Sequence, residues 1–313
     1  MIEGVTIIKA NRVRIITGGR QYQEPQASYQ SCRCIRSGHF RWNFTQKMKS
    51  IHQKIRSAYN STVRDIATKT GLHRYLRRYY FLFISNFTDS VLTHEIGDTE
   101  VSFIVRNYES WKRQQSFVGE LEVMKRFAED VSDSDVVWDV GANVGTYTCL
   151  AGKAADDVRV YAFEPLPQNI EILNENVGLN NIDVKVISKA LSDTSGEMGF
   201  KSPSSGAGGD YSLTEDPATM TIETSTGDSL VDRGDVDVPN IAKIDVEGAE
   251  VRVLEGVIET IESIDTLYIE VHPERIVSQG QTVGRLEEIL RNAGFNYERI
   301  HDRGSEYFIR AVK

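Results

Sequence analysis

An alternation of apolar, strand-like runs with helix-like segments occupies the chain from residue 136 onward and constrains its fold more than any other feature. The runs are apolar at successive positions, so both faces of each strand are expected to be buried. Strand–helix repetition with such strands predicts an α/β fold built on a parallel, doubly wound sheet. The expected strands are Val136–Gly141, Arg159–Glu164, Val184–Leu191, Ile241–Val246 and Leu267–His272.

The C-terminal end departs from this alternation. Two further strand-like runs, Tyr297–His301 and Tyr307–Val312, are separated only by a short polar link that contains Gly304. We therefore predict an antiparallel pair at one edge of the sheet. The helices expected between the strands are Thr146–Ala155, Pro167–Gly178, Ala249–Ile261 and Val283–Ala293.

The N-terminal third follows other patterns. Residues 1–40 show little periodicity, and we expect weak order there. Residues 41–88 are predicted to form a basic helical extension, because apolar residues from Phe44 to Ile66 recur every three or four positions. Residues 89–130 read as a β-hairpin with a Gly-Asp turn and a helix that begins near Phe117. Residues 131–313 form the main domain, and Lys201–Asp216 is a loop that we expect to cover a site.

Charge divides the chain in the same way. Residues 1–88 hold 16 Lys and Arg against 3 Asp and Glu, whereas residues 89–313 hold 20 against 42. A basic extension before an acidic body suits contact with nucleic acid, an anionic membrane face or an acidic partner. An acidic body argues against nucleic acid as the substrate. The oligomeric state does not follow from the sequence.

No targeting or spanning segment is expected. The longest apolar run, near Tyr79–Ile84, is far shorter than the roughly 20 residues that a membrane span needs. The N-terminus lacks the charged, apolar and small-residue order of a signal peptide. The three cysteines, Cys32, Cys34 and Cys149, form neither a disulfide framework nor a zinc spacing. We therefore expect a cytoplasmic protein, with peripheral contact at the inner membrane face as an addition through its basic extension.

A glycine turn follows the first strand of the sheet. Gly141-Ala-Asn-Val-Gly145 lies where ligands bind in doubly wound sheets, outside the carboxyl ends of the strands. Glycines allow close approach of the backbone, and the helix start that follows offers free N–H groups. A dinucleotide and S-adenosylmethionine both fit this position. Asn143 stands where the dinucleotide fingerprint places its middle glycine, which argues against NAD.

Carboxylates mark the ends of three further strands. Glu164 ends the second strand, where it can accept hydrogen bonds from the hydroxyls of a ribose. Lys243, Asp245 and Glu247 share one face of the fourth strand and its end, because side chains alternate along a strand. In the fifth strand Glu270 and His272 share a face in the same way, with His272 at the tip. Charged groups in such positions are costly in a core and natural in a pocket.

Several of these segments, in this order, resemble the FkbM family of class I methyltransferases. The segments are VVWDVGANVGTYT, VYAFEPLPQNIEILNENVGLNN, KALSDTSGE, IAKIDVEGAEVRVLEG and LYIEVHP. The resemblance covers about residues 135–301 and leaves the region before Phe117 outside. It implies that residues 131–313 form a Rossmann-like, seven-stranded methyltransferase domain that uses S-adenosylmethionine. It also implies methylation of a hydroxyl oxygen, with sugars, glycolipids or natural products as acceptors.

The resemblance also implies roles for individual residues. Asp245 lies closest to the transferring methyl group, and Glu164 binds the ribose. Leu191 and Ser192 lie near the adenine. The residues implied around the amino-acid part of the cofactor are Asp139, Gly141, Ala142, Asn143 and Gly145.

Methyl transfer to a hydroxyl also needs a proton acceptor. His272 is the first candidate for the base, because an imidazole titrates near neutral pH. Asp245 and Glu247 are alternative candidates for the base, or for a group that orients His272. The same carboxylates with His272 are a donor set for a divalent cation, but we do not expect one, because oxygen-rich clusters also bind sugars directly.

Three other functions remain as alternatives. An NAD-dependent oxidoreductase or epimerase keeps the sheet and Glu164 but lacks the full glycine fingerprint. A nucleic-acid methyltransferase suits the basic extension, but the sequence lacks both an Asn-Pro-Pro-aromatic tip and a Pro-Cys nucleophile pair. A non-catalytic scaffold that only binds cofactor is opposed by the intact set of glycines and carboxylates.

Overall fold

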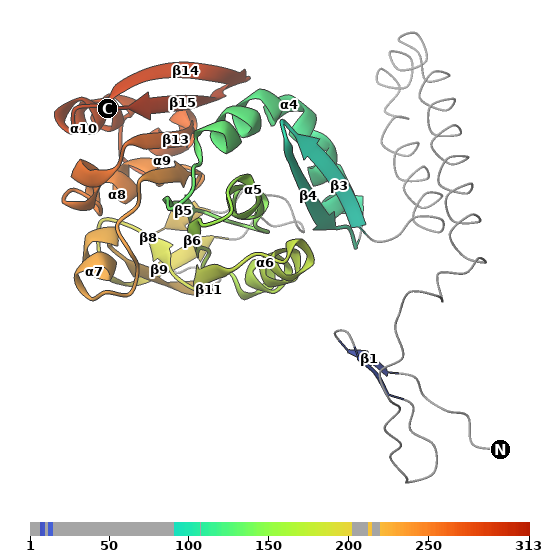
Figure 1. Cartoon of the computed structure of the whole chain (residues 1–313). Coiled ribbons are helices and arrows are strands. Elements are labelled where there is room, and N and C mark those ends of the chain that lie inside the picture. Colours follow the sequence, from blue (N-terminus) through green and yellow to red (C-terminus); the bar gives the residue numbers. More distant parts are fainter. Residues whose placement is uncertain (1–6, 10–11, 15–90, 107, 202–211, 215–219) are drawn as a thin grey trace, which may run out of the picture. The chain divides into compact units, whose positions relative to one another are not determined.

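The computed structural model describes residues 7–9, 12–14, 91–106, 108–201, 212–214 and 220–313 (Figure 1). The chain divides into two compact units, Met1–Arg74 and Tyr75–Lys313. In the first unit β1 (Ile7–Lys9) pairs antiparallel with β2 (Arg12–Arg14). The helical extension expected at residues 41–88 lies outside the described residues, and so does most of segment 1–40, so both stay predictions.

Seven strands form the main sheet of the second unit, in the order β14-β15-β13-β12-β5-β6-β7. Neighbouring strands are parallel except at β15, which runs antiparallel to both β13 and β14. This order confirms the predicted α/β fold, the mostly parallel sheet and the antiparallel pair at its C-terminal edge. The strands are β5 (Val136–Val140), β6 (Arg159–Phe163), β7 (Val184–Ile187), β12 (Ile241–Ile244), β13 (Thr266–Val271), β14 (Asn296–Arg303) and β15 (Glu306–Val312).

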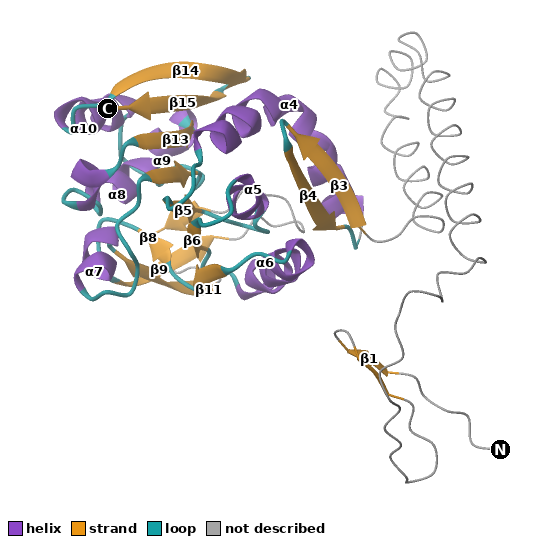
Figure 2. Ribbon diagram, viewed as in Figure 1, coloured by secondary structure: helices purple, strands orange, loops and turns teal. Residues whose placement is uncertain are grey.

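Helices cover both faces of this sheet (Figure 2). All five residues of β5 are buried; Trp138 and Val140 belong to one apolar cluster, whereas Val137 belongs to another. The first cluster includes residues of α7, α8 and α10, and the second includes residues of α4 and α5. The helices are α4 (Tyr108–Asp130), α5 (Thr146–Ala154), α6 (Pro167–Asn180), α7 (Gly227–Asp232), α8 (Glu250–Glu255), α9 (Pro273–Ser278) and α10 (Val283–Asn292).

The predicted hairpin before the core is confirmed. β3 (Val91–Ile96) pairs antiparallel with β4 (Thr99–Ile104). Asn180 of α6 accepts a hydrogen bond from the Ser102 amide at 2.9 Å, and Asn176 accepts one from the Ile104 amide at 2.9 Å. These two asparagine side chains thus provide acceptors for backbone N–H groups that an edge strand leaves unpaired. The helix that follows, α4, starts nine residues before the predicted Phe117.

A second, four-stranded sheet was not predicted. Its order is β10-β9-β11-β8, with β8 (Ala190–Leu191), β9 (Gly196–Lys201), β10 (Ser212–Thr214) and β11 (Met220–Ser225). The predicted strand Val184–Leu191 therefore divides, because Ala190 and Leu191 pair with β11 instead of β6. Part of the expected loop Lys201–Asp216 is strand β10. Residues 202–211 lie outside the described residues, so a covering role for that loop stays a prediction.

The predicted helix Ala249–Ile261 is also divided. α8 ends at Glu255, and a 3-10 helix, η1 (Thr260–Ser263), follows. A Cβ on Gly256 would lie 2.0 Å from the carbonyl oxygen of Ser192, so the chain packs backbone against backbone at this point. No helix within the described ranges is long and apolar enough to cross a membrane.

Candidate active site

The glycine turn joins β5 to α5 and carries three residues in the left-handed region. Gly141, Asn143 and Gly145 have φ values of 79°, 52° and 84°. A Cβ on Gly141 would lie 1.9 Å from the carbonyl oxygen of Asp245. The turn therefore needs glycine at its first position to let β5 approach the end of β12, in addition to any need of a ligand.

Glu164 follows β6 and holds this turn in place. Its side chain is almost fully buried, and Oε2 accepts a hydrogen bond from the Asn143 amide at 2.8 Å. Oε1 accepts from the Leu166 amide at 3.0 Å and from Nδ2 of Asn169 at 3.2 Å. Burial raises the pKa of Glu164, and these hydrogen bonds act against that rise.

A cavity lies along the carboxyl ends of β5, β6 and β12. Apolar side chains, among them Phe163, Leu166 and Val246, form part of its wall. The structure thus brings six of the predicted site residues together around one space. These six are Gly141, Asn143, Glu164, Leu191, Asp245 and Glu247.

The other five predicted site residues do not line this cavity: His272, described below, and the four that follow here. Asp139 is fully buried, and its Oδ2 accepts a hydrogen bond from Thr148 Oγ1 at 2.5 Å. Ala142 packs in a small apolar cluster, and Gly145 is the residue from which α5 begins. Ser192 is buried, and its hydroxyl donates to Asp193 at 2.9 Å. Contact of these four with a cofactor stays a prediction.

Lys243 lies between two acidic residues of neighbouring strands, Asp139 and Asp245. This lysine is buried, and its Nζ lies 3.1 Å from Asp245 Oδ2 and 3.8 Å from Asp139 Oδ1. Burial alone would raise the pKa of Asp245, but the charges of Lys243 and His272 hold it below its usual range. Asp245 is therefore ionised, with its side chain 26% exposed.

His272 lies beside this pair at the end of β13. It is 3% exposed, and its Nδ1 lies 2.7 Å from Oε1 of Glu250. Its Nε2 lies 3.3 Å from Oε2 of Glu247. Burial acts to lower the pKa of His272, but the hydrogen bond to Glu250 and the nearby carboxylates raise it to about 9. The ring is thus mainly protonated at neutral pH, and it must lose a proton before it can act as a base.

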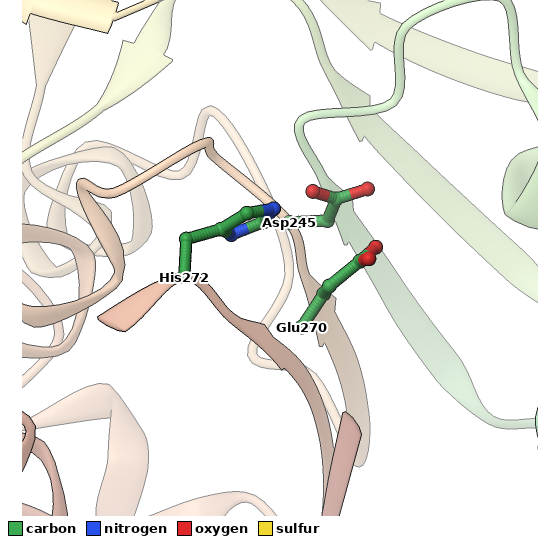
Figure 3. A group of neighbouring side chains, drawn as sticks. All are labelled: Asp245, Glu270 and His272. Atoms are coloured by element: carbon green, nitrogen blue, oxygen red, sulfur yellow. The ribbon is translucent and has the colours of Figure 1, made fainter. Parts of the chain in front are cut away.

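Asp245, Glu270 and His272 face one another (Figure 3). One donor atom of each lies within 4.8 Å of the others, so this set has the spacing of a metal site. However, Lys243 already contacts Asp245, and Arg303 Nη1 lies 3.2 Å from Glu270 Oε1. Two protein cations therefore already neutralise the carboxylates that a metal ion would use.

Glu247 stands in a constrained turn between β12 and α8. Its φ of 55° is unfavourable for a residue with a side chain. A Cβ on the next residue, Gly248, would lie 2.6 Å from Cβ of Arg275, so the turn packs tightly against α9. Arg275 forms an ion pair with Glu247 and lies 3.5 Å from Glu306. The turn places the Glu247 carboxylate against His272.

Sequence reasoning missed four polar residues around the site. Arg113 of α4 donates to Asn143 Oδ1 at 2.7 Å, and Glu120 of the same helix lies 2.5 Å from Arg303 Nη1. Glu250 underlies His272. These contacts join residues 22 to 183 positions apart, which no local pattern reports. Of the four, only Glu250 lies in a segment that carries the family resemblance, IAKIDVEGAEVRVLEG.

The sheet order and the glycine turn define an α/β protein with a ligand cavity at its strand ends. The profile of the methyltransferase FkbM domain matches residues 139–297. The chain belongs to this family and is a methyltransferase, which confirms the resemblance stated from its motifs.

Two curated relatives agree with the assignment. The hexuronic acid methyltransferase AglP of Haloferax volcanii is 34% identical over 183 residues, which cover 58% of this chain and 75% of that protein. The 31-O-demethyl-FK506 methyltransferase FkbM of Streptomyces tacrolimicus is 29% identical over 202 residues, covering 54% and 76%. Among solved structures, M. jannaschii TYW2 in complex with AdoMet is 19% identical with a TM-score of 0.38, covering 72% of this chain and 85% of that one.

Proposed function

We propose that this methyltransferase moves a methyl group from S-adenosylmethionine to a hydroxyl oxygen of a glycan, a glycolipid or a similar small molecule. One observation carries the proposal: a buried carboxylate, Glu164, lines a cavity between the glycine turn and Asp245. A carboxylate there accepts hydrogen bonds from ribose hydroxyls.

The free acceptor position of Glu164 and the apolar wall of the cavity both fit such a ligand. A carboxylate has about four acceptor positions, and backbone and side-chain groups occupy three of those on Glu164. The remaining position, on Oε2, is available to a ribose hydroxyl. The apolar wall with Phe163 and Leu191 suits the flat face of an adenine.

The donor supplies an electrophilic methyl group on a sulfonium; as the acceptor oxygen bonds to that carbon, the carbon–sulfur pair returns to sulfur. The chain has to hold the acceptor near this methyl group and to take its hydroxyl proton. Asp245 and Glu247 border the cavity on the side of His272, so we place the acceptor there. Carboxylates at this edge can accept hydrogen bonds from other hydroxyls of a sugar.

Support for a sugar acceptor comes from the relative that methylates a hexuronic acid. The test is methyl transfer by the full chain from methyl-labelled S-adenosylmethionine to glycans with and without a hexuronic acid. Glu164→Ala should lower transfer at limiting donor by about 10-fold or more, because a hydrogen bond to a charged group is lost. Glu171→Gln, an exposed change on α6, should not. Donor binding without transfer to any glycan would contradict the proposal.

The partner of the basic extension is a separate proposal. The 16 Lys and Arg of residues 1–88 suit an anionic membrane face or a partner in glycan assembly. Removal of residues 1–69 should reduce sedimentation with vesicles that contain anionic lipid, and raised salt should do the same. Unchanged sedimentation of the shortened chain would contradict this proposal.

A further inference from the structure

Glu250 is a buried acid in the first turn of α8, outside the predicted site. Its exposure is 0%, which is rare for a glutamate unless its carboxylate is paired. Oε1 accepts a hydrogen bond from the Gly248 amide at 2.9 Å and lies 2.7 Å from His272 Nδ1. The Gly248 contact serves the turn, whereas the contact with His272 reaches the end of another strand.

This contact fixes the ring of His272. A carboxylate only accepts hydrogen bonds, and Glu250 at 2.7 Å from Nδ1 is closer to the ring than Glu247 at 3.3 Å from Nε2. We therefore infer that the neutral ring keeps its proton on Nδ1. Nε2 is then the atom that gains or loses a proton. It faces Glu247 at 3.3 Å, on the side where Asp245 and Glu270 also lie (Figure 3).

We propose that Glu250 is a positioning residue for methyl transfer: it keeps His272 in the tautomer that presents a bare Nε2 to the acceptor hydroxyl. This inference rests on the proposed function. As the acceptor oxygen forms its bond to the methyl carbon, the O–H bond breaks and the proton moves to Nε2. Glu250 then stabilises the imidazolium that results, without contact with the acceptor.

The surroundings of His272 predict a pH dependence. Facing charged groups come from the turn after β12, from α8, β13 and α9, and from the β14–β15 hairpin. They are Asp245, Glu247, Glu250, Glu270, Arg275, Arg303 and Glu306. Because carboxylates predominate, the ring is charged at neutral pH. Transfer should therefore accelerate as the pH rises towards the His272 pKa of about 9.

The experiment uses the full chain with ¹⁵N-labelled histidine and NMR titration of the ring nitrogens, with His272→Gln to assign the signal. Wild type should show Nδ1–H in the neutral ring. Glu250→Gln should lower the His272 pKa by about one unit or more and mix the tautomers, because a facing negative charge is lost. Glu255→Gln is the matched control on α8, since Glu255 pairs with Arg285 at 2.9 Å.

A kinetic readout separates positioning from mere stability. The alkaline rise of the transfer rate should move to lower pH in Glu250→Gln by the same amount as the NMR pKa, with a plateau lower by roughly 10-fold. An unmoved rise, or an unchanged pKa and tautomer, would overturn the proposal. If Glu250→Gln does not fold, an Nε2–H tautomer in wild type would overturn it alone. Absence of transfer in wild type contradicts the proposed function, whereas the NMR result tests Glu250 independently.

Discussion

The two halves of the site are built in different ways. On the side of β5 and β6, a backbone turn and one carboxylate form the cavity, and neutral N–H groups satisfy that carboxylate. On the side of β12 and β13, charged side chains neutralise one another around Lys243 and His272. In the first half the backbone and one carboxylate shape a cavity, whereas in the second half charged groups balance one another, so a substitution of one leaves its partners unpaired.

The largest effect is expected at Lys243. Its replacement by Met leaves the buried Asp139 and the partly buried Asp245 without their shared cation. Breaking a buried ion pair in this way costs about 3–5 kcal/mol of unfolding free energy. Lys185→Met, at an exposed lysine, should change that free energy by less than about 0.5 kcal/mol. Equal losses in denaturant unfolding would mean that the charge balance is not special.

Gly141→Ala tests the first half. The added Cβ would meet the Asp245 carbonyl oxygen at 1.9 Å with φ at 79°, so we expect a loss of about 2–3 kcal/mol or more. Gly178→Ala is the matched control, because its Cβ meets no atom within 4 Å on helix α6 and should stabilise by about 0.5–1 kcal/mol. A Gly141 variant as stable as wild type would show that the turn is not constrained by β12.

The pH dependence of the unfolding free energy tests the charge arrangement in the second half of the site. The folded pKa of His272, about 9, lies above its unfolded value near 6.5. Its stabilisation is therefore complete below about pH 6.5 and is lost as the pH rises towards 9. Burial and the neighbouring Asp245 also raise the pKa of Glu270, which adds loss in the same direction.

Denaturant unfolding at several pH values checks this slope. Wild type should lose stability between pH 6.5 and 9, and His272→Gln should flatten that loss. A wild type whose stability rises over this range would contradict the charge arrangement.

The smallest effect is expected from chelation. Lys243 and Arg303 already contact the carboxylates of the cluster of Asp245, Glu270 and His272. Transfer activity should therefore stay within about twofold after EDTA treatment, since no step needs a divalent ion. Activity that falls with EDTA and returns with Mg²⁺ or Mn²⁺ would place a metal ion in this cluster.

The same contrast explains what the sequence could predict. The strand–helix alternation and the turn at Gly141 are local patterns, so the sheet and the cavity residues on its first half were predictable. The small sheet of β8–β11 was not, because β8 and β10 span only two and three residues and β9 contains Gly196 and Gly199. Glu250 and Arg303 reach the site only through tertiary contacts.

The predicted sheet also indicated which strand ends lie close together. Asp245 and His272 end two adjacent parallel strands, so their proximity followed from the predicted sheet. The protonated state of His272 did not follow, because it depends most on the hydrogen bond to Glu250 of α8. The sequence shows that a histidine is present, but the charged groups around it depend on the tertiary structure.

Calorimetry of S-adenosylmethionine binding tests the central claim most directly, with wild type, Glu164→Ala, Asp245→Ala and the exposed control Glu171→Gln. We predict micromolar binding by wild type and by Glu171→Gln. Glu164→Ala should bind about 10- to 100-fold more weakly, and Asp245→Ala should retain most of its affinity. Wild type that fails to bind, or Glu164→Ala that binds as tightly as wild type, would contradict the placement of the cofactor in this cavity.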